Sequence, residues 1–523
     1  MLIYSMKPGH DGTVAAIDAN SQKLLFSYEA EKDSFPRYEV FNPALLLDSA
    51  QELGSFPDVF AISGWSKAGL ADNAGIGAGY FGIGESNQQQ KETTLFGQKT
   101  NYFSSTHAAS HIWSSYGMSP FEQGQPCYAL IWEGALGDFY EIDENLNVTH
   151  LGNVMMTPGN KYSFLYALAD PSFTLPKGQL RYGDPGKLMA LCAFGQSGKP
   201  SDQEWSLIDS LLNRTSILKT LEKDDLADSP YYNIGLLDPQ FTQLAKRFSD
   251  ELFKRFHAFA KENLTKGYPL LISGGCGLNC DWNTAWKNTE LFEDIFIPPC
   301  TNDTGSAIGT AIDAMRHFTG KAKVEWSVYS GQDYIDDQPE MNDVETFTLD
   351  IDHVADMLAK DHVIAWAKGK CEIGPRALGN RSLIAAPFSE DMQKRLNKIK
   401  RREGFRPIAP FCLEEDVSEH FDWTGPSEYM LHFQKVKNNN LKAITHVDNT
   451  ARVQTVNHSQ NENIHSLLSA FKNKTGTGVL CNTSLNFNGT GFINRTSDLY
   501  HYCKENKIDG FVYANKLCMF KGS

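Results

Sequence analysis

Alternating apolar runs and glycine-rich turns predict two strand–turn–strand units in the amino-terminal part of the chain. An apolar run at residues 2–5 breaks at a turn-forming segment, residues 8–12, and resumes at residues 14–18. Residues 128–143 repeat the same order of strand, glycine-rich turn and strand. Each unit is typical of a β-hairpin. Their separation of about 120–130 residues indicates a duplicated architecture.

Two further glycine-rich turns are candidates for nucleotide binding. Residues 273–279 follow an apolar strand predicted at residues 269–272 and precede a predicted helix, and residues 298–309 have a similar pattern. Glycine at such a turn lets the backbone approach a nucleotide and point its N–H groups at the phosphates. A tight turn without a ligand is the alternative interpretation. The candidate residues are Gly274, Gly275, Asn279 and Asn302.

The hydrophobic periodicity is lost at residues 321–342, which contain turn-forming residues and follow neither the helical nor the strand pattern. Beyond this stretch, residues 354–358 are predicted to be helical and residues 363–367 to form a buried strand. We therefore place a domain boundary here, which gives domains of residues 1–335 and 336–523.

The composition is that of a globular protein. Apolar residues make up 41% and charged residues 21% of the 523 residues, and this length favours at least two domains. No apolar stretch is long enough to cross a membrane, and the first residues lack the pattern of a signal peptide. The ten cysteines are scattered along the chain, which favours reduced thiols over disulfides or a zinc ribbon. We expect a cytoplasmic protein with no membrane partner.

Two histidines and nearby carboxylates predict a metal site. His107 and His111 are four residues apart, so on a helix they lie on one face and within reach of one ion. Glu133 or Asp138, together with Asp303, would add carboxylate ligands. Such a set suits Fe²⁺, Zn²⁺ or Mn²⁺. The alternative is a pair of polar residues on a solvated helix.

Basic residues in the carboxy-terminal part predict an anion site. The net charge of −15 disfavours nucleic acid as a partner, yet a dense basic run occupies residues 394–406. In residues 374–382 and 398–410, Arg and Lys alternate with Gly, Pro and Ser, a pattern more typical of phosphate or carboxylate binding than of a solvated helix face. Residues 481–486 add amide and hydroxyl groups. A basic surface patch is the alternative.

The order of these motifs resembles that of the carbamoyltransferases of antibiotic and nodulation-factor biosynthesis, and most closely their hydroxymethylcephem branch. The resemblance extends over nearly the whole chain, and the blocks GPRALGNRS and FRPIAP are its most specific parts. The matching motifs are PGHDG at 8–12, HAASH at 107–111, GDPGKLMALCAFG at 183–195, SGGCGLNC at 273–280, TNDTGSA at 301–307, EIGPRALGNRS at 372–382, IKRREGFRPIAP at 399–410 and CNTSLN at 481–486.

The resemblance implies an α/β fold in which a duplicated actin-like domain of the threonylcarbamoyl-transfer type is followed by an α+β YrdC-like domain. It implies an enzyme with two linked sites. The YrdC-like domain would convert carbamoyl phosphate and ATP with Mg²⁺ into carbamoyl adenylate, releasing phosphate and pyrophosphate. The actin-like domain would pass the carbamoyl group to an acceptor hydroxyl, with Fe²⁺ or another divalent metal holding the nucleotide.

Site residues follow from the matching positions. Glu133 stands where the family usually has Asp, so its ligand role is less secure than that of the other three metal-site residues. His10 matches the residue that activates the acceptor hydroxyl, and an imidazole is a suitable general base. Residues 488–495 depart from the family pattern. The resemblance implies metal ligands His107, His111, Glu133 and Asp303, catalytic residues His10, Lys400 and Arg406, and carbamoyl phosphate and ATP contacts Arg376, Arg452, Asn482 and Ser484.

The sequence does not identify the acceptor of the carbamoyl group, and three alternatives for the function stay open. The first is a hydroxymethyl group of a small molecule such as a cephem or another secondary metabolite. The second is hydroxymethylcytosine in DNA or RNA, since the chain is unusually rich in Asn and Lys for an antibiotic producer. A third alternative is a nucleotide-binding regulator without catalysis, although retention of both sets of site residues disfavours it. The sequence does not give the oligomeric state, and a homodimer is one of the states it leaves open.

Overall fold

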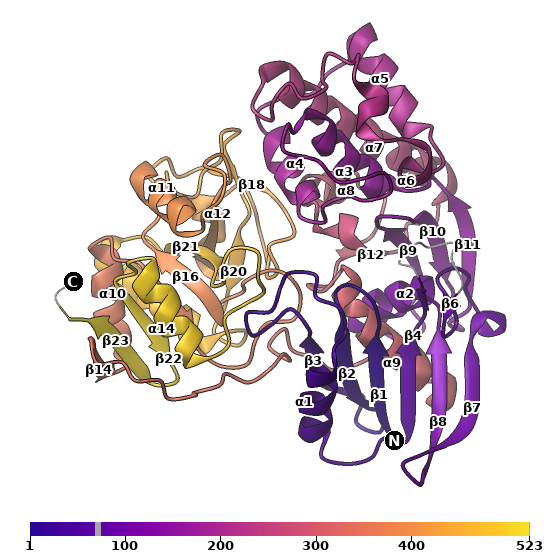
Figure 1. Ribbon diagram of the computed structural model, residues 1–523, viewed down its shortest axis with the longest axis horizontal. Helices are drawn as coiled ribbons and strands as arrows, with labels where there is room; N and C mark the ends of the chain where they lie inside the picture. The colour runs from indigo at the N-terminus through magenta and orange to yellow at the C-terminus, as the bar shows by residue number, and fades with distance from the viewer. Residues whose placement is uncertain (68–74, 522–523) are drawn as a thin grey trace. The chain divides into compact units, whose positions relative to one another are not determined.

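The computed structural model describes residues 1–67 and 75–521, and this part of the chain is a mixed α/β structure (Figure 1). Contacts between Cα atoms divide it into two compact units. The first unit consists of Met1–Gly9, Ala15–Leu24 and Leu53–Glu325, and the second of His10–Val14, Leu25–Glu52 and Trp326–Ser523.

The division into units differs from the predicted domains in two ways. The second unit begins at Trp326, ahead of the predicted boundary after residue 335, and it also includes two stretches from the beginning of the chain. Periodicity indicates where elements lie but not which distant segment they contact, so these stretches could not be assigned from the pattern alone. The stretch that was predicted to lack structure lies between helix α9 (Ser306–Thr319) and strand β14 (Val344–Thr348).

Two sheets, formed by strands that precede α9, share the order of their first five strands. The first has the order β3-β2-β1-β4-β8-β7, and the second has the order β11-β10-β9-β12-β13. In each sheet, a third strand lies beside the second strand of a hairpin. The first strand of the hairpin has a parallel neighbour on its other side, in the pairs β1–β4 and β9–β12. The predicted hairpins and their repetition are therefore confirmed. The strands are β1 (Leu2–Lys7), β2 (Thr13–Asp18), β3 (Lys23–Glu29), β4 (Val59–Ser63), β7 (Gln89–Leu95), β8 (Gln98–Ser105), β9 (Cys127–Trp132), β10 (Gly137–Ile142), β11 (Val148–Asn153), β12 (Leu270–Ser273) and β13 (Ile295–Phe296).

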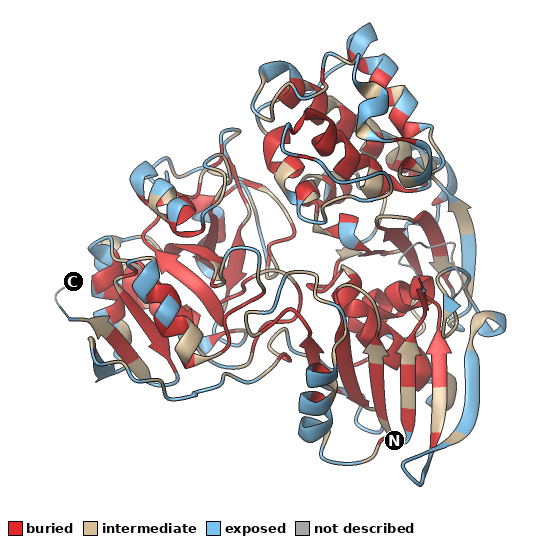
Figure 2. Ribbon diagram, viewed as in Figure 1, coloured by how far each residue is buried: buried red, intermediate tan, exposed pale blue. Residues whose placement is uncertain are grey.

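Helices α2 (His107–Met118) and α9 pack against each other, α2 against β9 and β12, and α9 against β1, β4 and β8. All of α2 and the residues of α9 up to Met315 are buried (Figure 2). Thr106 caps α2 by accepting a hydrogen bond from the Ala109 N–H, which satisfies one of the donors left at a helix start. His107, as the first residue of α2, is therefore held in the interior of the first unit.

A group of helices follows β11 in the first unit. The longest, α7, packs against α3, α4 and α5. Its buried apolar face includes Phe248 and Leu252, and its Phe256 packs against Trp132 of β9. The helix predicted after residue 279 is α8. The bounds are α3 (Pro158–Ala169), α4 (Asp184–Cys192), α5 (Asp202–Leu212), α6 (Ile217–Thr220), α7 (Pro239–Asn263) and α8 (Cys280–Lys287).

An eight-stranded sheet of order β14-β23-β22-β15-β16-β21-β17-β20 forms the centre of the second unit. Successive residues of its strands face two different cores. Ile364 and Trp366 pack with α10 and α13, whereas Ala365 and Ala367 share a core with residues of α11 and α14. This alternation is the two-residue period of a strand covered on both faces. The predicted helix and strand at residues 354–367 are confirmed as α10 and β15.

The remaining elements complete the two units. The first unit also contains the short strands β5 (Trp65–Ser66) and β6 (Gly75–Ile76). The helices of the second unit are α1 (Pro43–Leu53), apart from its last residue, α10 (Ile351–Ala359), α11 (Glu390–Ile399), α12 (Val417–His420), α13 (Glu462–Thr475) and α14 (Thr496–Glu505). Its other strands are β15 (Ile364–Ala367), β16 (Arg381–Ala385), β17 (Ala409–Leu413), β18 (Gln434–Lys435), β19 (Thr450–Ala451), β20 (Gln454–Val456), β21 (Val479–Ser484), β22 (Gly510–Tyr513) and β23 (Lys516–Phe520).

The cysteines and the apolar segments agree with the sequence-based expectations. All ten cysteines lie in the described part of the chain, and each is a buried free thiol. Among the described residues, no helix has both the length and the apolar character needed to cross a membrane.

Candidate functional site

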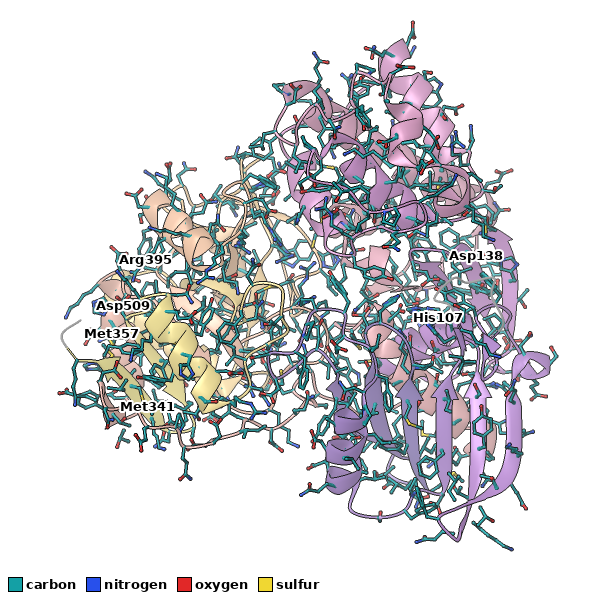
Figure 3. The ribbon with its side chains drawn as sticks, viewed as in Figure 1. His107, Asp138, Met341, Met357, Arg395 and Asp509 are labelled. Carbon is teal, nitrogen blue, oxygen red and sulfur yellow. The ribbon has the colours of Figure 1, made fainter. Side chains whose placement is uncertain are left out.

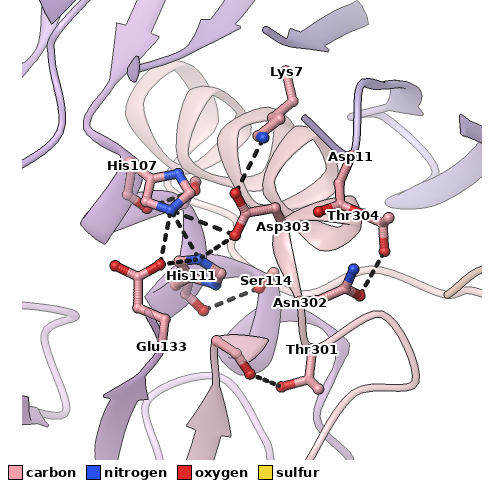
Figure 4. A network of polar contacts seen from close by, with 12 residues as sticks. Lys7, Asp11, His107, His111, Ser114, Glu133, Thr301, Asn302, Asp303 and Thr304 are labelled. Atoms are coloured by element: carbon pink, nitrogen blue, oxygen red, sulfur yellow. Dashed lines mark hydrogen bonds and ion pairs between the residues drawn. The ribbon is translucent and has the colours of Figure 1, made fainter. Parts of the chain in front are cut away.

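The predicted metal ligands converge inside the first unit (Figure 4). His107 and His111 come from α2, Glu133 follows β9, and Asp303 begins the turn before α9. Each residue offers one ligand atom, and the four atoms lie within 4.8 Å of one another. All four side chains are buried, so the interpretation as a solvated helix face is wrong for both histidines.

The separations between the four groups suit one bound ion. The two Nε2 atoms are 3.2 Å apart, and Glu133 Oε2 lies 3.2 Å from His107 Nε2 and 3.7 Å from His111 Nε2. Asp303 Oδ1 lies 3.6 and 3.4 Å from the same nitrogens. Ligands placed about 2.1 Å from a metal in a tetrahedron are about 3.4 Å from one another. Burial lowers the pKa of His107, which favours the neutral imidazole that a metal requires.

Of the two alternative carboxylates Glu133 and Asp138, Glu133 joins Asp303 at this site. Asp138 Oδ1 lies 2.8 Å from Nε2 of His150, and its other oxygen accepts hydrogen bonds from Gly137 N and Asn153 Nδ2. Figure 3 labels Asp138 and His107 in the first unit. The two carboxylates that the sequence left as alternatives therefore have different partners.

Two residues that sequence reasoning missed complete the surroundings of the metal site. Tyr80 donates its hydroxyl to Glu133, with 2.9 and 3.1 Å to the two carboxylate oxygens, and its ring lies 4.3 Å from that of His107. Lys7 is fully buried, and its Nζ lies 3.1 Å from Asp303 Oδ2. The position of Lys7 at the end of a buried strand and next to a glycine-rich turn is a signal that could have indicated it, whereas no pattern pointed to Tyr80.

The glycine-rich turn after β12 closely approaches the neighbouring strand. Gly274 has a positive φ of 101°, and a Cβ there would lie 2.4 Å from the Trp132 carbonyl oxygen. Only glycine adopts this conformation without strain. A Cβ at Gly275 would meet no atom within 4 Å, so the backbone is accessible on that side.

The two asparagines predicted to bind nucleotide have local partners. Asn279 caps α8 by accepting hydrogen bonds from Asp281 N and Trp282 N. Asn302 Oδ1 accepts a hydrogen bond from the Thr304 hydroxyl at 2.9 Å. Both side chains therefore shape the turns that carry them, and nucleotide binding by these residues stays a prediction.

His10, the predicted general base, lies in the second unit. Its Nδ1 is 2.8 Å from Asp11 Oδ2, and the imidazole is partly exposed, at 26%. A carboxylate at Nδ1 fixes the orientation of the ring and leaves Nε2 for another partner. Its predicted role at the transfer site stays a prediction.

The predicted anion site is built around Lys400, which directly follows α11 in the second unit. Its Nζ donates to Ser484 O at 2.6 Å, to Asn486 O at 2.9 Å and to Asn486 Oδ1 at 2.5 Å. The Ser484 hydroxyl donates to the same Asn486 oxygen. Burial, together with the positive charges of Arg402 and Arg406, lowers the pKa of Lys400 well below its usual range. This ammonium therefore gains stability from a bound anion.

Other cations surround Lys400. Partial burial, together with Arg406 and Arg452, lowers the pKa of Arg402 to about 9. Arg402 was visible in the basic run but was not predicted as a site residue. The Nε of Arg452 is buried and has no hydrogen-bond partner among the described residues, and Arg406 lies 3.8 Å from Glu403. Cations that lower one another's pKa values with few carboxylates between them favour an anion at this place.

The loop that carries Arg376 contacts Asn482 of β21, whose Nδ2 donates to the Ala377 carbonyl. Glu372 shapes this loop by accepting hydrogen bonds from the N–H groups of Leu378, Asn380 and Arg381. The structure therefore brings the loop of Arg376 next to the strand of Asn482 and Ser484.

The beginning of the basic run lies ahead of the anion-binding pattern predicted at residues 398–410. Lys394 and Arg395 lie on α11, where they pair with Asp391 at 3.0 Å and Asp509 at 2.8 Å, and Figure 3 labels the second pair. They belong to a solvated helix face. Lys398 and Arg401 are exposed as well, so within the run Lys400 is the buried cation, and Arg402 and Arg406 are partly buried.

Comparison with known proteins supports the assignment made from the motifs. Residues 94–312 match the family described as Carbamoyltransferase N-terminus, and residues 355–519 match Carbamoyltransferase C-terminus. The chain is 46% identical to 3'-hydroxymethylcephem-O-carbamoyltransferase of Amycolatopsis lactamdurans, with 98% of each chain covered. It is 45% identical to the enzyme of the same description from Streptomyces clavuligerus, again with 98% of each chain covered.

A more distant relative extends the comparison. Nodulation protein U of Bradyrhizobium diazoefficiens is 31% identical, over 94% of this chain and 93% of that protein. Both family regions and nearly the whole length of these relatives are therefore matched. The chain belongs to the carbamoyltransferase family of enzymes.

Proposed function

We propose that this enzyme is an ATP-dependent O-carbamoyltransferase that uses carbamoyl phosphate, through a carbamoyl-adenylate intermediate, to carbamoylate a hydroxymethyl group of a small molecule. The observation that carries the proposal is the 46% identity to a hydroxymethylcephem carbamoyltransferase over 98% of both chains. Residues 1–335 would form an actin-like transfer domain, and residues 336–523 would form a YrdC-like, adenylate-forming domain. The repeated strand order of the first two sheets supports the actin-like part.

The cations around Lys400 suit the first reaction. Carbamoyl phosphate, ATP and one water would give carbamoyl adenylate, phosphate and pyrophosphate. Both organic reactants are anions, so fixed cations such as Lys400, Arg402 and Arg406 offset their repulsion. Arg376, Arg452, Asn482 and Ser484 would bind the phosphate oxygens and the carbamoyl group, and Mg²⁺ would accompany ATP.

The cluster of His107, His111, Glu133 and Asp303 suits the transfer step. A divalent metal such as Fe²⁺ held by these four residues would supply positive charge for the nucleotide oxygens. Lys7 adds a second positive charge beside Asp303. The backbone at Gly274 and Gly275, with Asn279 and Asn302, would contact the nucleotide.

His10 would remove the proton from the acceptor hydroxyl. Asp11 lies at its Nδ1, so the proton would be accepted at Nε2. The deprotonated oxygen would attack the carbamoyl carbon, and the bond from that carbon to the AMP oxygen would break. The products would be the carbamate ester and AMP.

A pyrophosphate-release assay tests the adenylate step. Purified protein receives ATP and Mg²⁺ with and without carbamoyl phosphate, and Lys400→Ala is compared with Lys394→Ala. Release that needs carbamoyl phosphate, disappears in Lys400→Ala and persists in Lys394→Ala supports the proposal. The control removes a cation from the exposed half of the same basic run. Absence of release in the wild-type protein under any metal or acceptor would refute it.

A panel of acceptors identifies the substrate class. A 3'-hydroxymethylcephem, other small hydroxymethyl compounds and hydroxymethylcytosine DNA are incubated with the complete reaction and analysed by mass spectrometry. We expect a small molecule to gain the mass of one carbamoyl group in place of one hydrogen. A gain only on the DNA would refute the small-molecule assignment and retain the carbamoyl-transfer chemistry.

A further inference from the structure

Residues 29–38, here called the 29–38 segment, come from the beginning of the chain yet pair with the loop whose sequence departs from the family pattern. Ser34 N donates to Phe492 O at 3.0 Å, Gly491 N donates to Phe35 O at 2.8 Å, and Arg37 N donates to Gly489 O at 2.9 Å. A Cβ at Gly491 would lie 1.9 Å from the Glu31 carbonyl oxygen. Only glycine therefore permits this approach, and the unusual loop is shaped to receive the segment.

Buried charges attach the 29–38 segment to a second loop. Lys32 is 1% exposed, and its Nζ donates to Gly374 O at 2.7 Å and lies 3.2 Å from Glu29 Oε2. Gly374 N donates to the other oxygen of Glu29. Gly374 is two residues from Arg376. Buried ion pairs contribute little net stability because both charges lose their hydration, so stability alone is a weak reason for this arrangement.

The loop that receives the segment also holds Lys400. Asn486, which accepts from Lys400 Nζ, donates its Nδ2 to Thr490 O at 3.0 Å. Thr490 forms a β-bridge with Pro36, the neighbour of Arg37. A continuous chain of contacts therefore leads from the Lys400 ammonium through Asn486 to the backbone of the 29–38 segment.

Arg37 is held in a defined position on this segment. Its Nε lies 3.1 Å from Oε2 of Glu31, whose carboxylate is almost fully buried, and the Arg37 side chain is 26% exposed. Glu31 Oε2 also accepts the N–H of Tyr38 at 3.1 Å. The positive charge of Arg37 contributes to lowering the pKa of Lys400, after burial, Arg402 and Arg406. A partly open guanidinium is thus fixed beside a group of cations.

We propose that Arg37 is a further substrate-binding residue of the carbamoyl phosphate and ATP site, and that Glu31 positions it. This inference rests on the proposed function. The site is then assembled from the 29–38 segment together with the part of the chain from Trp326 onward, and residues 336–523 alone do not contain all of it. The guanidinium binds a phosphate oxygen of one anionic substrate, a role that its planar donor groups suit.

Calorimetric binding of carbamoyl phosphate and of ATP with Mg²⁺ to the full chain tests the inference without requiring turnover. Arg37→Gln should weaken binding of at least one of the two anions by about tenfold to a hundredfold, as expected for loss of a hydrogen bond between charged groups. The matched control is Arg495→Gln, which removes another arginine that pairs with the same segment, through Asp33. This variant should bind both anions as the wild-type protein does.

A double variant separates substrate binding from charge balance. Arg37→Gln alone leaves the Glu31 carboxylate buried without its cation, whereas Glu31→Gln with Arg37→Gln removes both charges. If Arg37 binds substrate, the double variant recovers thermal stability but not affinity. Recovery of affinity in the double variant, or unchanged affinity in Arg37→Gln, would overturn the inference.

The same experiment distinguishes this inference from the proposed function. Wild-type protein that binds both anions but releases no pyrophosphate would refute the adenylate chemistry, and weaker binding in Arg37→Gln would still support the role of Arg37. Wild-type protein that binds neither anion would refute both.

Discussion

The Nε2 atoms of His107 and His111 face each other at 3.2 Å in the interior of the first unit. Two neutral imidazoles can share one proton in a hydrogen bond, but here Glu133 and Asp303 also approach the same two nitrogens. Four ligand atoms directed at one point in a buried place are the arrangement that a metal ion stabilises, and the four donors are of the types that divalent transition metals bind.

Loss of either histidine should abolish metal binding. His111→Ala is expected to purify with less than a tenth of the metal content of the wild-type protein, measured by mass spectrometry of the elements. His150→Ala, which removes the partner of Asp138, is the control and should retain the metal. Protein from which the metal and then the chelator have been removed, assayed with ATP and Mg²⁺, should lose carbamoyl transfer but keep pyrophosphate release. Loss of both reactions in this metal-depleted protein, with Mg²⁺ present, would contradict the assignment of the metal to transfer.

Tyr80 should increase the metal affinity of the site without being a ligand itself. Tyr80→Phe removes the hydroxyl that donates to Glu133, so the carboxylate loses its orientation, and partners of this kind typically affect metal affinity by about 10- to 100-fold. Calorimetric titration of the metal-free protein measures the change. The control is Tyr162→Phe, which removes a buried hydroxyl beside Cys192 and should leave the affinity unchanged. Equal affinities in wild type and Tyr80→Phe would show that Glu133 needs no such support.

Alanine substitutions at the adjacent residues Gly274 and Gly275 should distinguish the structural role of this turn from a role in ligand binding. Gly274→Ala combines a positive φ with a Cβ close to the Trp132 carbonyl, and we expect it to lower the free energy of unfolding by about 1–3 kcal/mol from the backbone conformation alone. Gly275→Ala meets no neighbouring atom and should unfold as the wild type does in denaturant. If this turn contacts the nucleotide, Gly275→Ala should still lose carbamoyl transfer while keeping pyrophosphate release. If Gly275→Ala transfers the carbamoyl group at the wild-type rate, the turn has a structural role and does not contact the nucleotide.

The local pattern of apolar and polar residues was sufficient to predict much of the fold. The repeated hairpins and the helix and strand at residues 354–367 were recognisable because apolar residues alternate with the period of each element. The spacing of His107 and His111 indicated a metal site because residues four apart share a helix face. The residues themselves also indicated Asp303 and the basic pattern at residues 398–410, and the family resemblance then gave individual residues such as His10 and Lys400 their expected catalytic roles.

Long-range contacts account for what the sequence could not show. The 29–38 segment joins residues 489–492 through backbone hydrogen bonds, which depend on the path of the chain and not on side-chain type. Tyr80 reaches Glu133 across 53 positions of sequence, and nothing in its neighbourhood marks it. Lys394 and Lys400 look alike in the sequence, yet one lies on an exposed helix face and the other is buried, because α11 ends between them.

Lys400 should make anion binding dependent on pH. In the free protein, burial and the neighbouring arginines lower the pKa of Lys400, and a bound anion favours the ammonium form and raises this pKa again. Between the lowered pKa of the free protein and the higher pKa of the complex, binding therefore takes up a proton. The affinity for the anion falls as pH rises through this window. Below the window, Lys400 is protonated in both states and contributes no pH dependence. Calorimetry of ATP binding at a pH above the range in which ATP itself titrates, in buffers of different ionisation enthalpy, measures the uptake. Lys400→Arg keeps the charge but does not deprotonate, so its proton uptake should vanish, whereas uptake that persists in this variant would assign the proton to another group.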